Sequence, residues 1–257
     1  MITVLDIDET NFNDVFKVCS IKHLDDPTFK KGIELKQRWI KENLTKYGPF
    51  IKIAYYNNTP AAQIMFYPET AIPYYKHPRQ RVIEIFCAYR SLDDAKGAGT
   101  ILLKKLIDEA KKGIKCLDGE PCNFLVASPF NTGEGTSLRE YYINNGFQES
   151  ESELYLELTG KYYPRKKENY ENPFEDKGKA IIFYDMNCEY GWVFAENIEK
   201  ILRDIDNSLE ILKINKWNNP TESIKRGNAT LTVNGVMIKS GWRTPEFQSE
   251  VKKALNM

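Results

Sequence analysis

The sequence has no excess of charge of either sign, because its 257 residues carry 36 basic and 36 acidic side chains. A balanced charge gives no reason to expect nucleic acid or an anionic membrane as a partner. The sequence also lacks an apolar run long enough to span a bilayer, and its first residues lack the basic flank and apolar block of a signal peptide. We therefore expect no nucleic-acid partner, no membrane anchor and a cytoplasmic location.

Cysteine and histidine are few, and their spacing does not fit a metal site. The chain has five cysteines without a CxxC pair, and only two histidines, His23 and His77. Structural zinc sites need four such ligands in closely spaced motifs, so we expect no metal centre. The cysteine pattern also gives no disulfide framework, which favours a reduced intracellular protein. The cysteines are Cys19, Cys87, Cys116, Cys122 and Cys188.

Over residues 1–160, apolar spacing typical of helices is interspersed with apolar runs typical of strands. Helical spacing of apolar residues predicts helices, and runs of β-branched and aromatic residues predict strands. The strand over 81–89 is apolar almost throughout, so we expect it to be central and buried on both faces. The predicted helices lie within 11–23, 27–46, 93–112 and 138–147, and the predicted strands within 50–56, 61–67, 81–89, 122–128 and 153–158.

The stretch "DDAKGAGTILLKKLIDEAKK", residues 93–112, places two glycines at the start of a strong helix. Ser, Thr, Asp and Asn usually lead there, so glycine indicates a tight turn or a ligand that comes close to the backbone. A buried strand, a glycine turn and a helix start together form an anion site, because free helix N–H groups point at one spot. The P-loop motif is absent, and Leu102 stands where the dinucleotide fingerprint has its third glycine.

Gly97 and Gly99 after a buried strand, followed by the signature "YINNGF" over Tyr142–Phe147, resemble the GNAT superfamily of N-acetyltransferases. The resemblance covers residues 1–160 and includes the order of the predicted elements. It implies an α/β (α+β) domain with a splayed central mixed sheet. It also implies acetyl-CoA as cosubstrate, held where the strands over 81–89 and 122–128 separate, and direct transfer of the acetyl group to an amine in a ternary complex.

The same resemblance implies which residues line this gap. Backbone N–H groups from Asp94 to Thr100 would hold the pyrophosphate, and the strand over 81–89 would pair with the pantetheine arm. The N–H of Cys87 or its neighbour would polarise the thioester carbonyl, and Asn131 would contact the pantetheine. The implied cofactor-binding set is Phe86, Cys87, Tyr89, Asp94, Ala95, Lys96, Gly97, Ala98, Gly99, Thr100 and Asn131.

Two residues are candidates for catalysis. By resemblance, Tyr142 protonates the departing thiolate. Glu84 is the only carboxylate inside the strand over 81–89, and it is either the general base or a packing carboxylate with its own partner; histone-type family members carry their glutamate one residue earlier, at Ile83. Asp94 stands where the family usually has Arg or Gln, which reduces affinity for the pyrophosphate unless Lys96 supplies the charge.

Composition changes after residue 160. Residues 161–178 are charged, contain two prolines and lack an apolar period, so we expect a linker whose basic cluster is solvated surface. Residues 179–257 follow as strand–helix–strand–helix–hairpin–helix, which resembles a smaller, degenerate thioredoxin-like α/β domain of the YoaP-like type. Cys188 stands where that fold keeps its nucleophilic cysteine, but Gly191 replaces the second cysteine and Ala229 the cis-proline. We expect a helix that starts near Gly191 to favour the Cys188 thiolate slightly, and Asp185 and Glu189 to oppose its ionisation.

These patterns favour an acetyl-CoA-dependent N-acyltransferase that acts on a small-molecule or peptide amine. Two other classes stay open: a CoA-binding or partner-binding module without turnover, and a thiol sensor centred on Cys188. The sequence leaves the acceptor and the oligomeric state open, because acceptor pockets in such enzymes are built from variable N-terminal helices and loops.

Overall fold

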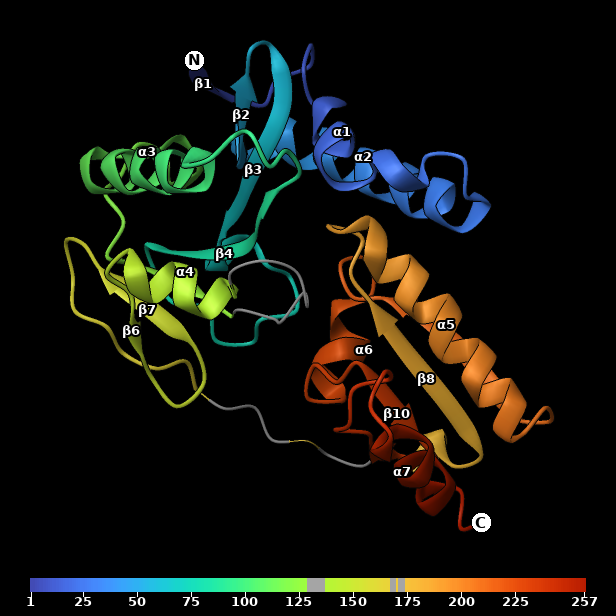
Figure 1. Ribbon diagram of the computed structural model, residues 1–257. Coiled ribbons are helices and arrows are strands. Elements are labelled where there is room, and N and C mark those ends of the chain that lie inside the picture. The colour runs from blue at the N-terminus through green and yellow to red at the C-terminus, as the bar shows by residue number, and fades with distance from the viewer. Residues whose placement is uncertain (129–136, 167–169, 171–173) are drawn as a thin grey trace. The chain divides into compact units, whose positions relative to one another are not determined.

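The computed structural model describes residues 1–128, 137–166, 170 and 174–257, and Figure 1 shows its elements. The chain forms two compact units, each made of segments that are not contiguous in sequence. Unit 1 comprises Met1–Lys22, Ile40–Ile72 and His77–Lys166, and unit 2 comprises His23–Trp39, Pro73–Lys76 and Lys167–Met257. The predicted partition into 1–160, 161–178 and 179–257 stays a prediction.

Unit 1 is built on a seven-stranded mixed sheet in the order β1-β2-β3-β4-β5-β7-β6. Neighbouring strands are antiparallel except β4 and β5, which are parallel. The predicted hairpin is present, and Asn57 and Asn58 in its turn both have the positive φ that a type I′ turn requires. The strand bounds are β1 Ile2–Asp6, β2 Ile51–Tyr56, β3 Thr59–Pro68, β4 Val82–Arg90, β5 Phe124–Ala127, β6 Gln148–Glu149 and β7 Leu154–Glu157.

Helix α3 (Ala98–Lys112) covers one face of this sheet. Its apolar side chains form one cluster with alternate residues of β3 and β4, which confirms the predicted apolar face of the helix. Helix α1 (Asp14–Cys19) packs on the opposite face, where Gln63 of β3 contacts the sulfur of Cys19. Unit 1 also contains α4 (Leu138–Asn144) and short 3-10 helices at Glu69–Ala71 and Lys115–Leu117. Helix α2 (Pro27–Tyr47) is divided between the units after Trp39, and the 3-10 helix Ile21–His23 is divided after Lys22.

Unit 2 is built on a four-stranded mixed sheet in the order β11-β10-β8-β9, in which β8 and β9 are parallel. The predicted order of strand, helix, strand, helix, hairpin and helix is present. Helix α5 runs alongside β8 (Figure 1), and α5 and α7 share a core with alternate residues of β8 and β10. The bounds are β8 Lys179–Tyr184, α5 Glu189–Ile205, β9 Glu210–Asn215, α6 Pro220–Lys225, β10 Leu231–Val233, β11 Val236–Met237 and α7 Glu246–Ala254, preceded by a 3-10 helix at Phe174–Asp176.

A buried ion pair holds the first turn of α5. Lys36 Nζ lies 2.8 Å from Glu189 Oε2, and both side chains are almost fully buried. Gly32 permits this approach, because a Cβ there would lie 2.3 Å from the carbonyl oxygen of Glu189. Two charges buried together are tolerated because each neutralises the other, so the loss of one partner is costly.

Replacing Lys36 by Met should therefore lower the free energy of unfolding by about 3–5 kcal/mol, since Glu189 would keep its buried charge without this cation. The exposed pair Lys31–Glu34, with side chains 50% and 64% exposed, provides the matched control. Lys31→Met should cost less than about 1 kcal/mol. Urea unfolding followed by circular dichroism measures both, and equal losses would contradict a special cost for the buried pair.

Candidate active site

The central feature of unit 1 is the point where β4 and β5 separate. Residues Val82–Ile85 pair with Phe124–Ala127 as a parallel ladder, and the ladder ends there. Strand β4 nevertheless continues to Arg90, still paired with β3 along its other edge. Within the described part of the chain, the edge of β4 beyond Ile85 thus has no strand partner, so its backbone N–H and C=O groups can pair with an added extended molecule.

A β-bulge lies at this point. Met65 of β3 pairs with Cys87 and the next residue, Phe66, pairs with Ile85, which leaves Phe86 as an extra residue on β4. A bulge bends its strand and re-aims the side chains that follow. The burial changes accordingly, from fully buried over Val82–Ile85 to half-buried over Phe86–Tyr89. The predicted residues Phe86, Cys87 and Tyr89 therefore lie on the half-buried part of β4, which still pairs with β3 but no longer with β5.

Helix α3 begins near this segment with an uncapped first turn. Gly97 is its N-cap residue, no side chain caps it, and the first intrahelical bond runs from the Ile101 N–H to the Gly97 carbonyl. The N–H groups of Gly99 and Thr100 precede that bond and so have no helical acceptor. They are suited to bind an anion at the positive end of the helix dipole.

Glycine is favoured at position 97 by the backbone conformation there, and not by a lack of space for a side chain. Its φ is +86°, in the left-handed region, while a Cβ there would meet nothing within 4 Å. Gly99 has ordinary helical geometry, and a Cβ there would make normal contact with the Tyr141 ring at 3.5 Å. In the same segment Ala95 and Ala98 are buried in the core, and Asp94 and Lys96 are exposed.

Two adjacent tyrosines of α4 lie close to these elements. The Tyr142 ring is 2% exposed and packs against Phe147 at 5.1 Å between centroids. Burial raises the pKa of its hydroxyl well above the ordinary value, and neighbouring Tyr141 and Cys87 add to the shift. The hydroxyl therefore stays protonated at neutral pH, which is the state a proton donor needs.

Tyr141 is a residue that the sequence did not single out. Its hydroxyl donates a hydrogen bond to the carbonyl oxygen of Gly99 at 2.7 Å, so it ties α4 to the first turn of α3. The only signal in the sequence was its position directly before Tyr142.

Glu84 lies on the other face of the sheet. Ile83 and Ile85 join the cluster under α3, so the alternation of β4 turns Glu84 away from that helix. Its Oε2 lies 3.6 Å from the guanidinium of Arg165. The basic cluster was predicted to be solvated surface, and for Arg165 this is wrong, because its side chain is only 22% exposed and approaches three carboxylates. The role of Glu84 as general base stays a prediction, and Asn131 lies outside the described residues.

Cys188 is the N-cap residue of α5, which begins at Glu189, two residues before the predicted start. The two carboxylates predicted to oppose its ionisation are both near lysines. Glu189 pairs with Lys36, and Asp185 Oδ2 lies 3.7 Å from Lys216 Nζ. Each of the two carboxylates thus has a cation near it that is distant in sequence, and the effect on the Cys188 thiol stays a prediction.

Position 191, where Gly191 was compared with a second cysteine, leaves no room for a side chain. A Cβ on Gly191 would lie 2.2 Å from the carbonyl oxygen of Asp185, so no side chain fits there without a backbone shift. Burial raises the pKa of the Cys116 and Cys122 thiols to about 12, so both stay protonated at neutral pH.

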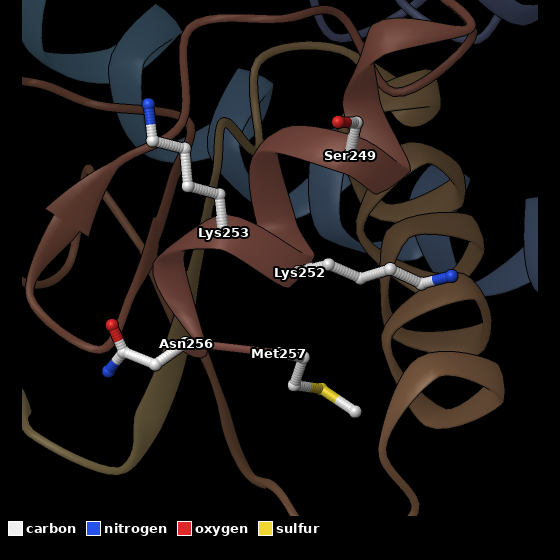
Figure 2. A pocket seen from close by; sticks show the side chains of 5 residues that line it. All are labelled: Ser249, Lys252, Lys253, Asn256 and Met257. Carbon is white, nitrogen blue, oxygen red and sulfur yellow. The ribbon is translucent and has the colours of Figure 1, made fainter.

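Other features of the described residues carry no chemistry of this kind. Over the ranges that the structure describes, no group of three or more His, Cys, Asp or Glu side chains is placed to hold a metal ion. None of the helices in those ranges combines the length and apolarity needed to span a membrane. Figure 2 shows a surface pocket at the end of α7, in unit 2, whose two lysine side chains point away from each other. It is lined by Ser249, Lys252, Lys253, Asn256 and Met257, and contains none of the candidate residues.

No family model and no curated protein matches the chain. Among solved structures, an N-acetyltransferase from Staphylococcus aureus Mu50 aligns with 61% of this chain and 98% of its own, at 14% identity and a TM-score of 0.43. An acetyltransferase of the GNAT family from Bacillus cereus ATCC 10987 aligns with 62% of this chain and 98% of its own, at 12% identity and a TM-score of 0.42. A GNAT family acetyltransferase from Brucella melitensis in complex with acetyl-CoA aligns with 64% of this chain and 92% of its own, at 12% identity and a TM-score of 0.42.

The two glycines should respond differently to alanine. Gly97→Ala should lower the free energy of unfolding by about 1–2 kcal/mol, because alanine is disfavoured in the left-handed region. Gly99→Ala should leave stability unchanged or raise it by up to about 1 kcal/mol, because alanine favours the helix and its methyl group has room. Urea unfolding measures both variants. Equal effects at the two positions would mean that the left-handed conformation of Gly97 is not what selects glycine.

Proposed function

We propose that unit 1 is an acetyl-CoA-dependent N-acyltransferase that transfers the acetyl group directly to a small-molecule or peptide amine. The observation that carries this proposal is the early end of the β4–β5 ladder beside the uncapped start of α3. Beyond Ile85, where β5 no longer pairs with it, β4 offers backbone groups to the amide-containing pantetheine arm. The N–H groups of Gly99 and Thr100 offer a site to the pyrophosphate.

The chain's own residues then have distinct roles in the reaction. Bound acetyl-CoA supplies the acetyl thioester. The N–H of Cys87 or its neighbour donates a hydrogen bond to the thioester oxygen and stabilises the negative charge that develops there. Tyr142 gives its proton to the sulfur as the carbon–sulfur bond breaks, and Glu84 accepts a proton from the attacking amine, directly or through water.

A second candidate function is binding of CoA without turnover. The Asp94 side chain is exposed in the segment that leads into α3. A carboxylate there opposes a bound pyrophosphate, and exposed Lys96 offsets it. This balance sets the affinity and does not by itself remove the transferase chemistry.

We further propose that unit 2 is a degenerate thioredoxin-like domain of the YoaP-like type, in a cytoplasmic protein. Support comes from its parallel β8–β9 pair joined through α5 and from Cys188 at the N-cap of that helix. Gly191 allows no second cysteine side chain in this backbone, so unit 2 has no dithiol chemistry of its own. A role for Cys188 as a thiol sensor stays open beside a structural one.

Isothermal titration of the full chain with acetyl-CoA tests the proposed function, followed by assays of thiol release over a panel of amines. Saturable binding with amine-dependent release of thiol is the expected result. Binding without release for any amine would favour the module without turnover, and the absence of binding would overturn both.

Tyr142→Phe should lower kcat by about 10²-fold, because the variant removes the proton donor while keeping the ring that packs in the core. The affinity for acetyl-CoA should change little. Tyr141→Phe is the matched control, since it removes the neighbouring hydroxyl and its bond to Gly99. If kcat falls in the Tyr141 variant and not in the Tyr142 variant, the acid has been assigned to the wrong tyrosine.

A further inference from the structure

The side chain of Tyr141 contacts the first turn of α3, beside the N–H groups proposed to bind the pyrophosphate. Its hydroxyl donates a hydrogen bond to the carbonyl oxygen of Gly99 at 2.7 Å. The ring lies against the same residue, because a Cβ on Gly99 would be 3.5 Å from the ring atom Cε2 and 3.7 Å from the hydroxyl oxygen. Tyr141 therefore meets Gly99 with both its ring and its hydroxyl group.

The position of Tyr141 is fixed by its own helix and by the core. Helix α4 begins after Ser137, whose side chain accepts a hydrogen bond from the N–H of Glu140. The N–H of Tyr141 donates to the carbonyl of Ser137, and its own carbonyl accepts from the Asn145 side chain at 2.7 Å. Its ring packs edge-on against that of Tyr142, with 5.0 Å between centroids, and joins the core cluster under α3. These contacts hold the ring in place before any ligand binds.

The hydroxyl of Tyr141 acts as the donor in its bond to Gly99. Burial raises the pKa of this hydroxyl above its ordinary value, so it keeps its proton at neutral pH. A carbonyl oxygen has two lone pairs and can accept two hydrogen bonds. Gly99 lies within α3, where its oxygen is also the helical acceptor for the N–H of Leu103. The Gly99 carbonyl thus receives a second donor that an ordinary helical carbonyl lacks.

The carbonyl of Gly99 and the N–H of Thr100 belong to one peptide group. A hydrogen bond at the oxygen draws electron density toward it, so the N–H of the same group becomes a stronger donor. The first intrahelical bond runs from the Ile101 N–H to the Gly97 carbonyl, and the N–H of Thr100 has no helical acceptor. Gly99 and Thr100 are half-buried, and such polarisation is stronger where water is partly excluded.

We propose that Tyr141 is a positioning residue that strengthens the Thr100 N–H as a donor to the pyrophosphate, and so favours coenzyme A thioesters over thioesters without a pyrophosphate. The inference rests on the proposed function for the identity of the anion. Tyr141 acts through the peptide that follows Gly99, so its effect belongs to binding and not to the chemical step. The adjacent tyrosines of α4 then have different tasks: Tyr142 gives a proton to the sulfur, and Tyr141 serves the phosphate end of the site.

A first test needs no ligand and uses the full chain labelled with nitrogen-15. Tyr141→Phe removes the hydrogen bond at the Gly99 oxygen, so the amide nitrogen resonance of Thr100 should move to higher field as the peptide loses polarisation. Tyr55→Phe is the matched control, because it removes a hydroxyl that donates to Asp14 at 2.7 Å elsewhere in unit 1. It should leave the Thr100 resonance in place. If Tyr141→Phe does not fold, Tyr141→Met serves instead, since it fills similar space without a hydroxyl.

A second test compares two acetyl donors by titration and by thiol release. Acetylpantetheine carries the thioester and the amide groups of acetyl-CoA but no pyrophosphate. Tyr141→Phe should weaken binding of acetyl-CoA, and raise its KM, by about 2- to 5-fold, because polarisation changes the strength of a hydrogen bond by about a tenth to a third. The kcat with acetyl-CoA and the kcat/KM with acetylpantetheine should stay the same, and Tyr55→Phe should change none of these values.

An equal loss of kcat/KM with both donors would indicate a merely structural role for Tyr141 and overturn the proposal. An unmoved Thr100 resonance in Tyr141→Phe would also overturn it, as would an equal loss of acetyl-CoA affinity in Tyr55→Phe.

The two proposals can fail separately. If the unmodified protein binds no acetyl-CoA, the proposed function is wrong, and the NMR comparison still decides whether Tyr141 polarises the peptide before Thr100. If the unmodified protein binds acetyl-CoA and Tyr141→Phe binds it equally well, the function stands and the role of Tyr141 is wrong.

Discussion

The structure of unit 1 depends on one constraint: the parallel ladder between β4 and β5 ends at Ile85 and Ala127, although β4 continues to Arg90. Beyond Ile85 no strand among the described residues pairs with this edge of β4, so the edge is suited to pair with an added extended molecule. The bulge at Phe86 and the drop in burial over Phe86–Tyr89 mark this change within the strand. The uncapped start of α3 adds unpaired N–H groups of the same kind. The edge of β4 and the start of α3 both present backbone groups. Together they favour a ligand with amide groups at one end and phosphates at the other.

Charge is buried in both units, and each buried carboxylate described here has a cation near it. In unit 2, Lys36 neutralises Glu189 at the first turn of α5. In unit 1, Lys52 lies between Asp6 and Glu109, and Arg79 joins Glu69 to Glu153. Such pairs are not a reliable source of stability, because desolvation offsets the attraction between the charges. Their effect is instead to fix which segments of the chain can meet.

Much of the candidate site could be predicted from the sequence, because it is built from local patterns. The apolar run of β4, the left-handed glycine at Gly97 and the amphipathic α3 are each encoded within a few residues. The strand β1 was missed because it is a short edge strand with several exposed residues. The bulge at Phe86 was missed because a bulge is defined by how two strands pair. It leaves no recognisable apolar pattern in the sequence of either strand alone.

The contacts that lie far apart in sequence could not be predicted at all. Tyr141 reaches the first turn of α3, and Arg165 reaches the carboxylates around Glu84, only through the folding of unit 1. For the same reason, the neutralisation of Glu189 by Lys36 was invisible when only the residues near Cys188 were considered. Local charge counting failed at Arg165, and near Cys188 it overlooked two lysines from distant segments.

The most direct test of the central claim is amide hydrogen exchange of the full chain with and without acetyl-CoA, read by mass spectrometry. If the open edge of β4 and the start of α3 hold the cosubstrate, exchange should slow in peptides that contain Phe86–Arg90 and Gly97–Thr100. Exchange in α7, which carries the surface pocket, should stay the same. Unchanged exchange in both segments at millimolar acetyl-CoA, or protection confined to α7, would contradict the account.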